Sequence, residues 1–223
     1  MQAAAATTLA TTSEAATVMP LPRFEGKDTP KICLEAALTP YATAASASVD
    51  EAAAASARRI RQLGVEYAIS GMAMPWTVDS LNTFMGRYKA HGVTVANIMI
   101  GGFNKAIYAK PGRDEEIEQV MKSVQAAGKV GLPVVEYNWY AHRAMEGYFE
   151  EPGRAGSGWT GFDYQRPSES NGKMVPFKDL PALDREGAHT LDEMWANITY
   201  FLKAVVPAAE KAGVRLADRK SVV

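Results

Sequence analysis

The hydrophobic positions of this chain alternate between helix-type spacing and short continuous apolar strands. At four places a helix-type segment ends in a glycine and passes directly into a strand; these junctions read RQLGVEYAIS, KAHGVTVANI, AAGKVGLPVVEYN and EKAGVRLA. A repeated junction of this kind is typical of parallel α/β folds built from successive strand–helix units. The pattern therefore predicts an α/β fold with a parallel sheet.

The same pattern predicts where the elements lie. Strands are expected at 31–38, 65–70, 93–100, 134–138 and 214–217. A capping box, Ser48 with Glu51, predicts a helix that ends near Leu63. Further helices are expected from Thr77, from Asp114 and from the second capping box at Thr190, and we expect Pro207 to kink or restart the last of these.

Between 139 and 188 the periodicity is lost. This stretch is rich in Gly, Pro, aromatic and charged residues, and we predict a long irregular loop. Irregular segments of this length in a compact domain are usually functional or disordered.

The sequence after the first strand argues against a dinucleotide-binding fold, because E-A-A-L-T-P stands where G-x-G-x-x-G would be required. A (β/α)8 barrel needs eight strands, and this chain supplies four and part of a fifth. We therefore predict a partial (β/α)8 TIM barrel of about four and a half βα units, with residues 31–217 as its N-terminal part.

Composition excludes several classes of partner. The 223 residues are 47% hydrophobic and carry a formal net charge of −1, so we expect no nucleic-acid surface and no membrane-binding polybasic run. No uninterrupted apolar stretch is long enough to predict a transmembrane helix. Cys33 is the only cysteine, which rules out an internal disulfide, and we interpret it as a buried strand residue.

The two ends of the chain differ in composition from the rest. Residues 1–30 begin with an Ala/Thr-rich run that we interpret as a disordered extension, or alternatively as the remnant of an export signal. A cytoplasmic location is predicted in the first case and an exported protein in the second. Residues 218–223 read D-R-K-S-V-V, which one frame of a common sequencing adapter also encodes, and we expect them to be a non-native tail.

In a barrel, candidate functional residues gather at the carboxyl ends of the strands and in the loops that follow. Glu136 and Asn138 are expected to share one face of their strand, with Tyr137 on the other. His142 and Arg143, just beyond, could hold a carboxylate or a sugar acid. Further candidates in these positions are Glu35, 70–75, 97–104, Glu146, Arg154, Asp163 and Arg166.

Two segments resemble the mannonate dehydratase family. The first is G-K-V-G-L-P-V-V-E-Y-N, which ends at Asn138, and the second is 191–217, with its W-A-N-x-x-Y-F and P-x-A-E-x-A-G-V motifs. Arg113-Asp114 also fits. The resemblance spans 114–217, while 142–164 departs from the best-known members, as expected of a divergent branch.

The resemblance implies a xylose isomerase-like barrel that dehydrates D-mannonate, a small sugar acid, to 2-keto-3-deoxy-D-gluconate with Mn²⁺ or Fe²⁺. Tyr137 and Asn138 match the family's Y-N pair and become substrate-pocket candidates, together with Glu35, Glu136, His142 and Arg143. The family's first metal ligands lie in a His-Pro-x-Asp run after strand five, whereas D-R-K-S-V-V follows Ala217 here. We therefore expect a fragment that binds no metal and is inactive alone, from an enzyme that could be a homo-oligomer.

Two alternatives remain open. The first is a sugar isomerase or epimerase of the wider xylose isomerase-like group, which shares the barrel. The second is a non-catalytic half-barrel that acts as a binding or assembly module, because its unpaired strand edges and uncovered helix faces would favour association.

Overall fold

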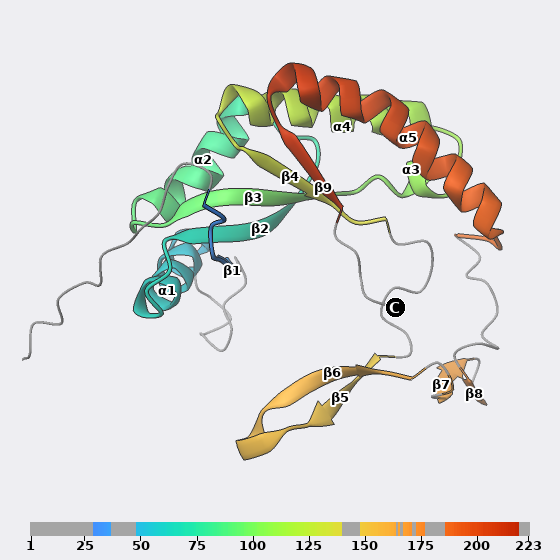
Figure 1. The fold of residues 1–223 in the computed structure, drawn as a ribbon, viewed down its shortest axis with the longest axis horizontal. Coiled ribbons are helices and arrows are strands. Elements are labelled where there is room, and N and C mark those ends of the chain that lie inside the picture. The colour runs from blue at the N-terminus through green and yellow to red at the C-terminus, as the bar shows by residue number, and fades with distance from the viewer. Residues whose placement is uncertain are drawn as a thin grey trace, which may run out of the picture. The chain divides into compact units, whose positions relative to one another are not determined.

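A computed structural model describes residues 29–36, 48–139, 148–163, 165, 167–170, 173–176 and 186–218. The chain divides into two units, Met1–Lys31 and Ile32–Val223, and every helix and strand lies in the second. Its main sheet has five parallel strands in the order β1-β2-β3-β4-β9 (Figure 1). These strands are β1 (Cys33–Glu35), β2 (Tyr67–Ala73), β3 (Thr94–Gly101), β4 (Val134–Tyr137) and β9 (Arg215–Asp218).

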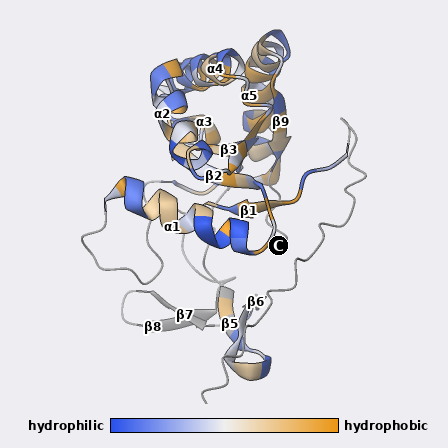
Figure 2. Ribbon diagram, turned by 90° about the vertical axis from the view of Figure 1, so that its left-hand side faces the viewer, coloured by the Kyte–Doolittle hydropathy of each residue, from blue (hydrophilic) through white to orange (hydrophobic). Residues whose placement is uncertain are grey.

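The strands are linked by helices α1 (Val49–Gln62), α2 (Val78–Lys89), α3 (Asn104–Ile107), α4 (Arg113–Lys129) and α5 (Leu191–Ala212). The capping boxes expected at Ser48 and Thr190 are both present, and Thr77 with Ser80 forms a third at the start of α2. In each box the side chain of the N-cap residue accepts from the backbone N–H three residues later, and the side chain of that later residue accepts from the N-cap backbone N–H. Figure 2 shows hydrophilic and hydrophobic residues alternating along α1 and α4, as helices with one buried face require.

The core lies between the sheet and these helices. The three central strands contribute residues to it, among them Ala68 of β2, Ile98 of β3 and Val135 of β4, each of which is fully buried. The helices contribute Leu81, Phe84, Tyr88, Val120, Val124, Phe201 and Val205. Because side chains alternate along a strand, the residues between the buried ones lie on the other face of the sheet.

The structure corrects several predicted boundaries. Strand β2 begins two residues later than expected and runs on to Ala73, because it pairs with β3 as far as Gly101. The four-residue helix α3 was not predicted, since it is too short to show a helical period. Helix α5 is continuous through Pro207, so the predicted restart is wrong, while the predicted kink stays a prediction; buried Val205 and Ala209 flank the proline and hold both halves in one core.

The predicted irregular loop contains two antiparallel hairpins. Strands β5 (Tyr148–Pro152) and β6 (Gly158–Phe162) form one, with the short 3-10 turn η1 (Arg154–Gly156) at its tip; β7 (Pro167–Ser170) and β8 (Lys173–Pro176) form the other. In the first hairpin the Phe149 ring lies against Gly161, its direct cross-strand partner. These strands of four or five residues are too short to be recognised by alternation alone, and β6 is further interrupted by two glycines.

Candidate functional site

The sheet face opposite the helices carries the polar candidates. Parallel register aligns Glu35 with Ile69, Ile69 with Asn97, and Asn97 with Val134. On β4, Glu136 follows Val134 on the same face, and Asn138 follows Glu136. The register therefore brings Asn97, from the middle of β3, to the same face as Glu136 and Asn138 at the carboxyl end of β4.

Asn97 and Glu136 are directly hydrogen-bonded. The Asn97 Nδ2 group donates to Glu136 Oε2 over 2.6 Å, and both side chains are partly buried. A carboxylate accepts hydrogen bonds but does not donate them when ionised, so this contact fixes which way the Asn97 amide points. The Asn97 Oδ1 atom is consequently directed away from Glu136, and it is buried with no hydrogen-bond partner among the described residues.

Asn138 lies on the same face as Glu136, as period two predicts. Its Nδ2 group lies 3.4 Å from the Met99 sulfur on β3, and its Oδ1 atom is also buried with no partner in the described part of the chain. A thioether is a weak acceptor. Asn138 thus retains hydrogen-bonding capacity at the end of β4.

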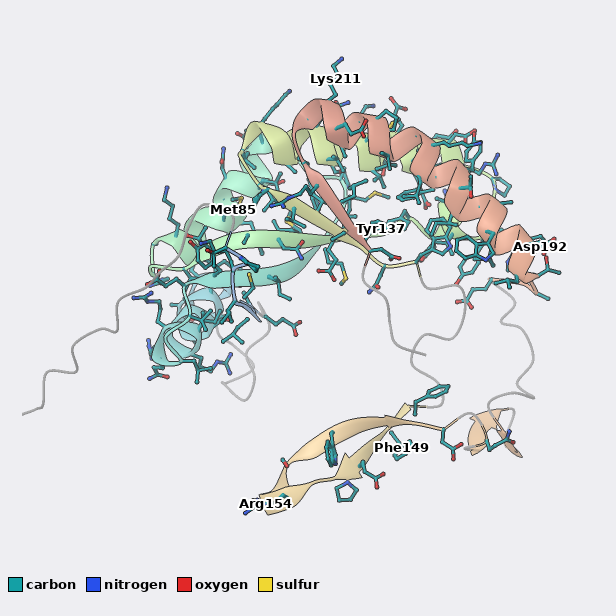
Figure 3. All side chains as sticks on the ribbon, in the orientation of Figure 1. Met85, Tyr137, Phe149, Arg154, Asp192 and Lys211 are labelled. Atoms are coloured by element: carbon teal, nitrogen blue, oxygen red, sulfur yellow. The ribbon has the colours of Figure 1, made fainter. Side chains whose placement is uncertain are left out.

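Tyr137 lies on the opposite face, between the sheet and α5 (Figure 3). It is 7% exposed, and its ring centre is 5.9 Å from that of Phe201. Burial raises the pKa of the Tyr137 phenol, and the Asp218 carboxylate on β9 raises it further. These contacts place Tyr137 in the helix–sheet core; its predicted part in a substrate pocket stays a prediction.

Glu35 is exposed at the end of β1. The residue after it, Ala36, anchors this strand end: its carbonyl accepts from Ser70 Oγ at 2.9 Å and from the Tyr88 hydroxyl at 3.4 Å. Two strand spacings separate Glu35 from Asn97, about 10 Å, so the register does not bring these two side chains together directly.

The remaining candidates fall into two groups. His142, Arg143, Glu146 and Arg166 lie outside the described residues. Arg154 lies in the turn of the β5–β6 hairpin, and Asp163 follows β6, where its Oδ1 accepts from the backbone N–H of Gln165 at 2.8 Å. Their roles stay predictions.

An aromatic cluster lies beside the end of β4. Phe103, from the loop after β3, stacks on Phe201 of α5 with ring centres 5.2 Å apart, and Trp139 lies 5.3 Å from the same Phe201 ring. Because Trp139 directly follows Asn138, this cluster fixes the chain immediately after the polar residues. The cluster was not predicted, since its members come from three separate segments.

The W-A-N-x-x-Y-F motif attaches α5 to its neighbours. Asn197 Nδ2 donates to the Ile107 carbonyl of α3 at 3.0 Å. The Tyr200 hydroxyl donates to Asp114 Oδ1 at 2.9 Å, and the Arg113 guanidinium lies 3.9 Å from the centre of the Tyr200 ring. Arg113-Asp114 and this motif, noted separately in the sequence, are therefore two sides of one contact.

The described residues contain no group of three or more His, Cys, Asp or Glu side chains that could hold a metal ion. No helix among them is long and apolar enough to cross a membrane.

Five parallel strands with helices on one face, and polar side chains at the strand ends on the other, define part of a (β/α) barrel. The crystal structure of mannonate dehydratase from Streptococcus suis serotype 2 has this fold: it matches 84% of this chain and 52% of its own, with a TM-score of 0.60 and 20% identity. The predicted fold class, a partial TIM barrel, is confirmed; the described sheet does not close.

The family follows from the sequence comparison. Residues 51–219 match the model of the D-mannonate dehydratase (UxuA) family, and the chain belongs to that family. It is 26% identical over 171 residues to the mannonate dehydratase of Streptococcus equi subsp. zooepidemicus and 32% identical over 136 residues to that of Streptococcus pneumoniae. These matches cover 64% and 48% of this chain but 43% and 33% of the relatives, so the chain spans less than half of their length.

Proposed function

We propose that this chain forms the first five strands of a hydro-lyase barrel that removes water from D-mannonate and yields 2-keto-3-deoxy-D-gluconate. The observation that carries the proposal is the family match over 51–219, which includes every main-sheet strand except β1. Membership of the family supports the reaction class. The sugar acid is the substrate proposed for the assembled barrel.

The part proposed for this chain is to bind and orient the substrate's hydroxyl groups. A sugar acid presents several hydroxyl donors, and the site has two buried acceptor oxygens, Asn97 Oδ1 and Asn138 Oδ1, with no partner among the described residues. A buried acceptor without a donor costs about 1–3 kcal/mol, which a hydroxyl at that position would recover. Glu136, held by Asn97, adds a carboxylate acceptor on the same face.

Dehydration itself needs a base that removes the C2 proton and an acid that protonates the departing C3 hydroxyl. The family resemblance implies Mn²⁺ or Fe²⁺ for such chemistry, but the described side chains do not form a set that fits a metal ion. We therefore assign no metal-dependent step to these residues. Their proposed contribution is to hydrogen bonding and to the position of the substrate.

A chimera tests the proposed function. Residues 31–218 of this chain would replace the matching part of the Streptococcus suis mannonate dehydratase, and formation of 2-keto-3-deoxy-D-gluconate from D-mannonate would be measured. We expect dehydration by the chimera, and a loss of kcat/KM of about tenfold or more in Asn138→Ala, since one substrate hydrogen bond is removed. Glu118→Ala is the control, because Glu118 lies on the outer surface of α4 and pairs with Lys122.

The alternatives give different results in the same experiment. A folded chimera that interconverts sugars without dehydrating D-mannonate would favour the isomerase or epimerase hypothesis. A folded chimera with neither activity would overturn the proposal. Unchanged kcat/KM in Asn138→Ala would contradict the assignment of Asn138 to the substrate-binding site, without contradicting the proposed dehydration reaction.

For the longer enzyme we propose a cytoplasmic location and a homo-oligomeric state, as expected for catabolism of a small sugar acid. The Ala/Thr-rich start of the chain makes the location testable: cell fractionation of the tagged chain with and without residues 1–19 would show whether these residues direct export. Their deletion should leave the distribution unchanged.

A further inference from the structure

Two of the four tryptophans, Trp76 and Trp139, are not exposed, and they differ in their hydrogen bonding. The Trp76 Nε1–H group donates to the Met72 carbonyl at 3.1 Å. Trp139 is half-buried as a whole, but its Nε1 atom is fully buried and has no hydrogen-bond partner among the described residues. A buried indole N–H usually finds an acceptor, because without one it forfeits the bond that water would supply. The Trp139 N–H therefore lacks the kind of partner that the Trp76 N–H has.

Aromatic contacts fix the position of the Trp139 ring. Its centre lies 5.3 Å from that of Phe201 and 6.2 Å from that of Phe103. Tyr137, two residues earlier, lies 5.9 Å from the same Phe201 ring, so Tyr137 and Trp139 both lie on the α5 side of their chain segment. Because two aromatic neighbours hold the ring, the N–H cannot turn toward another acceptor without disrupting this packing.

The unpartnered donor follows directly on an unpartnered acceptor. Asn138 precedes Trp139, so the Cα atoms of the two residues are about 3.8 Å apart. The Oδ1 atoms of Asn138 and Asn97 are both buried without a partner in the described part of the chain. Such atoms are few in native structures, and each requires an explanation. Three of them on β3 and at the end of β4 indicate one cause, a ligand that supplies both the missing donors and the missing acceptor.

The chemistry of these three atoms restricts the ligand. An asparagine Oδ1 only accepts hydrogen bonds, whereas an indole N–H only donates. The asparagines therefore suit hydroxyl groups, and the indole suits an acceptor; in a hydroxy acid the group that only accepts is the ionised carboxylate. The Glu136 carboxylate, bonded to Asn97 on the sheet face away from the helices, repels a second negative charge. The ligand's carboxylate is consequently favoured on the Trp139 side.

We propose that the Trp139 indole N–H binds the carboxylate of the sugar acid whose hydroxyl groups reach Asn97 and Asn138. The inference rests on the proposed function and deepens it, because it assigns the group that distinguishes a sugar acid from a neutral sugar alcohol. A hydrogen bond to a carboxylate is stronger than one to a neutral oxygen. Trp139 is therefore a specificity-determining residue, which favours the charged ligand over the uncharged alcohol of the same length.

NMR of the full 223-residue chain tests the proposal without turnover. Each tryptophan gives one indole N–H signal, and Trp139→Phe identifies the signal of Trp139. We expect D-mannonate to shift this signal downfield and saturably, because the N–H gains a carboxylate acceptor. D-mannitol, with a hydroxymethyl group in place of the carboxylate, should not shift it. The Trp76 signal should stay in place with both ligands, since its N–H is already bonded to Met72.

The affinity of Trp139→Phe gives a second measurement. This variant keeps an aromatic ring in the cluster and removes the N–H, so we expect the Kd for D-mannonate to rise about tenfold or more. The ligand-induced shift of the Asn138 side-chain amide reports the Kd in both proteins. Trp195→Phe is the matched control, because Trp195 is 63% exposed on α5 and should leave the Kd unchanged.

Thermal unfolding separates recognition from packing. Trp76→Phe loses a hydrogen bond that is made in the fold, whereas Trp139→Phe loses none. The Tm should therefore fall less in Trp139→Phe than in Trp76→Phe, although only Trp139→Phe weakens binding. An unchanged Kd in Trp139→Phe would overturn the proposal and leave the residue a part of the aromatic packing alone.

The NMR outcomes also separate this proposal from the proposed function. Equal shifts with D-mannonate and D-mannitol would show that the N–H meets a hydroxyl group, and an unmoved Trp139 signal would show that it meets no ligand; either result would overturn the carboxylate assignment. Dehydration by the chimera together with an unmoved Trp139 signal would contradict this assignment only. A shifted Trp139 signal together with a chimera that does not dehydrate D-mannonate would support the assignment and contradict the proposed function.

Discussion

Asn97 on β3 donates a 2.6 Å hydrogen bond to Glu136 on the neighbouring strand β4, on the sheet face away from the helices. The two residues are offset along the strands, since Asn97 is aligned with Val134 and Glu136 with Met99. The contact therefore joins the strands diagonally. It holds a carboxylate in place and fixes the orientation of the amide.

This contact predicts a loss of stability in Asn97→Ala. Hydrogen bonds to charged groups contribute about 1.5–3 kcal/mol; removal of the unpaired Asn97 Oδ1 atom offsets part of this, so we expect the free energy of unfolding to fall by about 1 kcal/mol. Urea unfolding of the full chain measures it. Asn82→Ala, at an exposed position of α2, should not destabilise. If Asn97→Ala lowered the free energy of unfolding no more than Asn82→Ala does, the Asn97–Glu136 hydrogen bond would contribute nothing to stability.

How far sequence predicts this site depends on the range of the interaction. Glu136 and Asn138 could be placed on one face because alternation along a strand is local. Asn97 was included only within a broad range, because its pairing with Glu136 depends on the register between β3 and β4. The match of residue 97 to 134 is set by tertiary packing, and the alignment of Asn97 with Ile69 follows an irregularity in the β2–β3 pairing at Ala68/Ile69; neither appears in the hydrophobic pattern.

The same division holds for the fold. Helix starts at Ser48 and Thr190 were predictable, because a capping box involves residues only three apart. The continuity of α5 through Pro207 could not be predicted, because the local preference of proline favours a break and packing around Val205 and Ala209 overrides that preference. The cluster around Phe201 joins segments about a hundred residues apart in the sequence, so no local signal announces it.

Titration of Tyr137 gives a second prediction. Burial, and then the Asp218 carboxylate, raise its pKa above the ordinary value of 10.0. A phenol whose pKa is higher in the folded state stabilises the fold below pH 10 and loses that contribution as the pH rises through the folded pKa. Tyr137→Phe should therefore make unfolding less sensitive to pH in the alkaline range, as measured by urea unfolding.

Asp218→Asn separates the two causes of the Tyr137 shift. It should lower the pKa of Tyr137 only in part, because burial is the larger cause and remains. The ultraviolet absorbance change of phenolate, compared with Tyr137→Phe to isolate this residue, reports the value. A return of the pKa to its ordinary value in Asp218→Asn would contradict the order of the causes.

The capping boxes predict acid sensitivity at two helix starts. Glu193 Oε2 accepts from Thr190 N–H at 2.7 Å and from the Thr190 hydroxyl at 2.9 Å, and Glu51 makes the same pair of bonds to Ser48. The hydrogen bond from the backbone N–H is the largest cause that lowers the pKa of each carboxyl below 4.5. Such a group stabilises the fold above pH 4.5 and loses its contribution as the pH falls through the folded pKa.

The double variant Glu51→Gln, Glu193→Gln should therefore lose less stability than the unmodified chain as the pH falls from about 5 to about 3, the range in which carboxylates titrate. Gln keeps a side chain that can accept from the helix start but does not titrate. Glu210→Gln, in the exposed last turn of α5, is the control. If the free energy of unfolding fell equally with pH in the unmodified chain, the double variant and Glu210→Gln, the two capping carboxylates would not contribute to acid sensitivity.

Gly128 of α4 gives the sharpest test of how closely α5 packs. A Cβ atom at Gly128 would strike the carbonyl oxygen of Ala212 and lie 3.0 Å from the Ala212 Cβ, so the backbone of one helix would have to move. We expect Gly128→Ala to destabilise by about 1–3 kcal/mol through overpacking. Gly86→Ala on α2 is the matched control, because nothing lies within 4 Å of its added Cβ. Replacing that helical glycine should stabilise by about 0.5–1 kcal/mol. Thermal unfolding would show opposite signs for the two substitutions, and a stabilising Gly128→Ala would mean that α4 and α5 are not in close contact in solution.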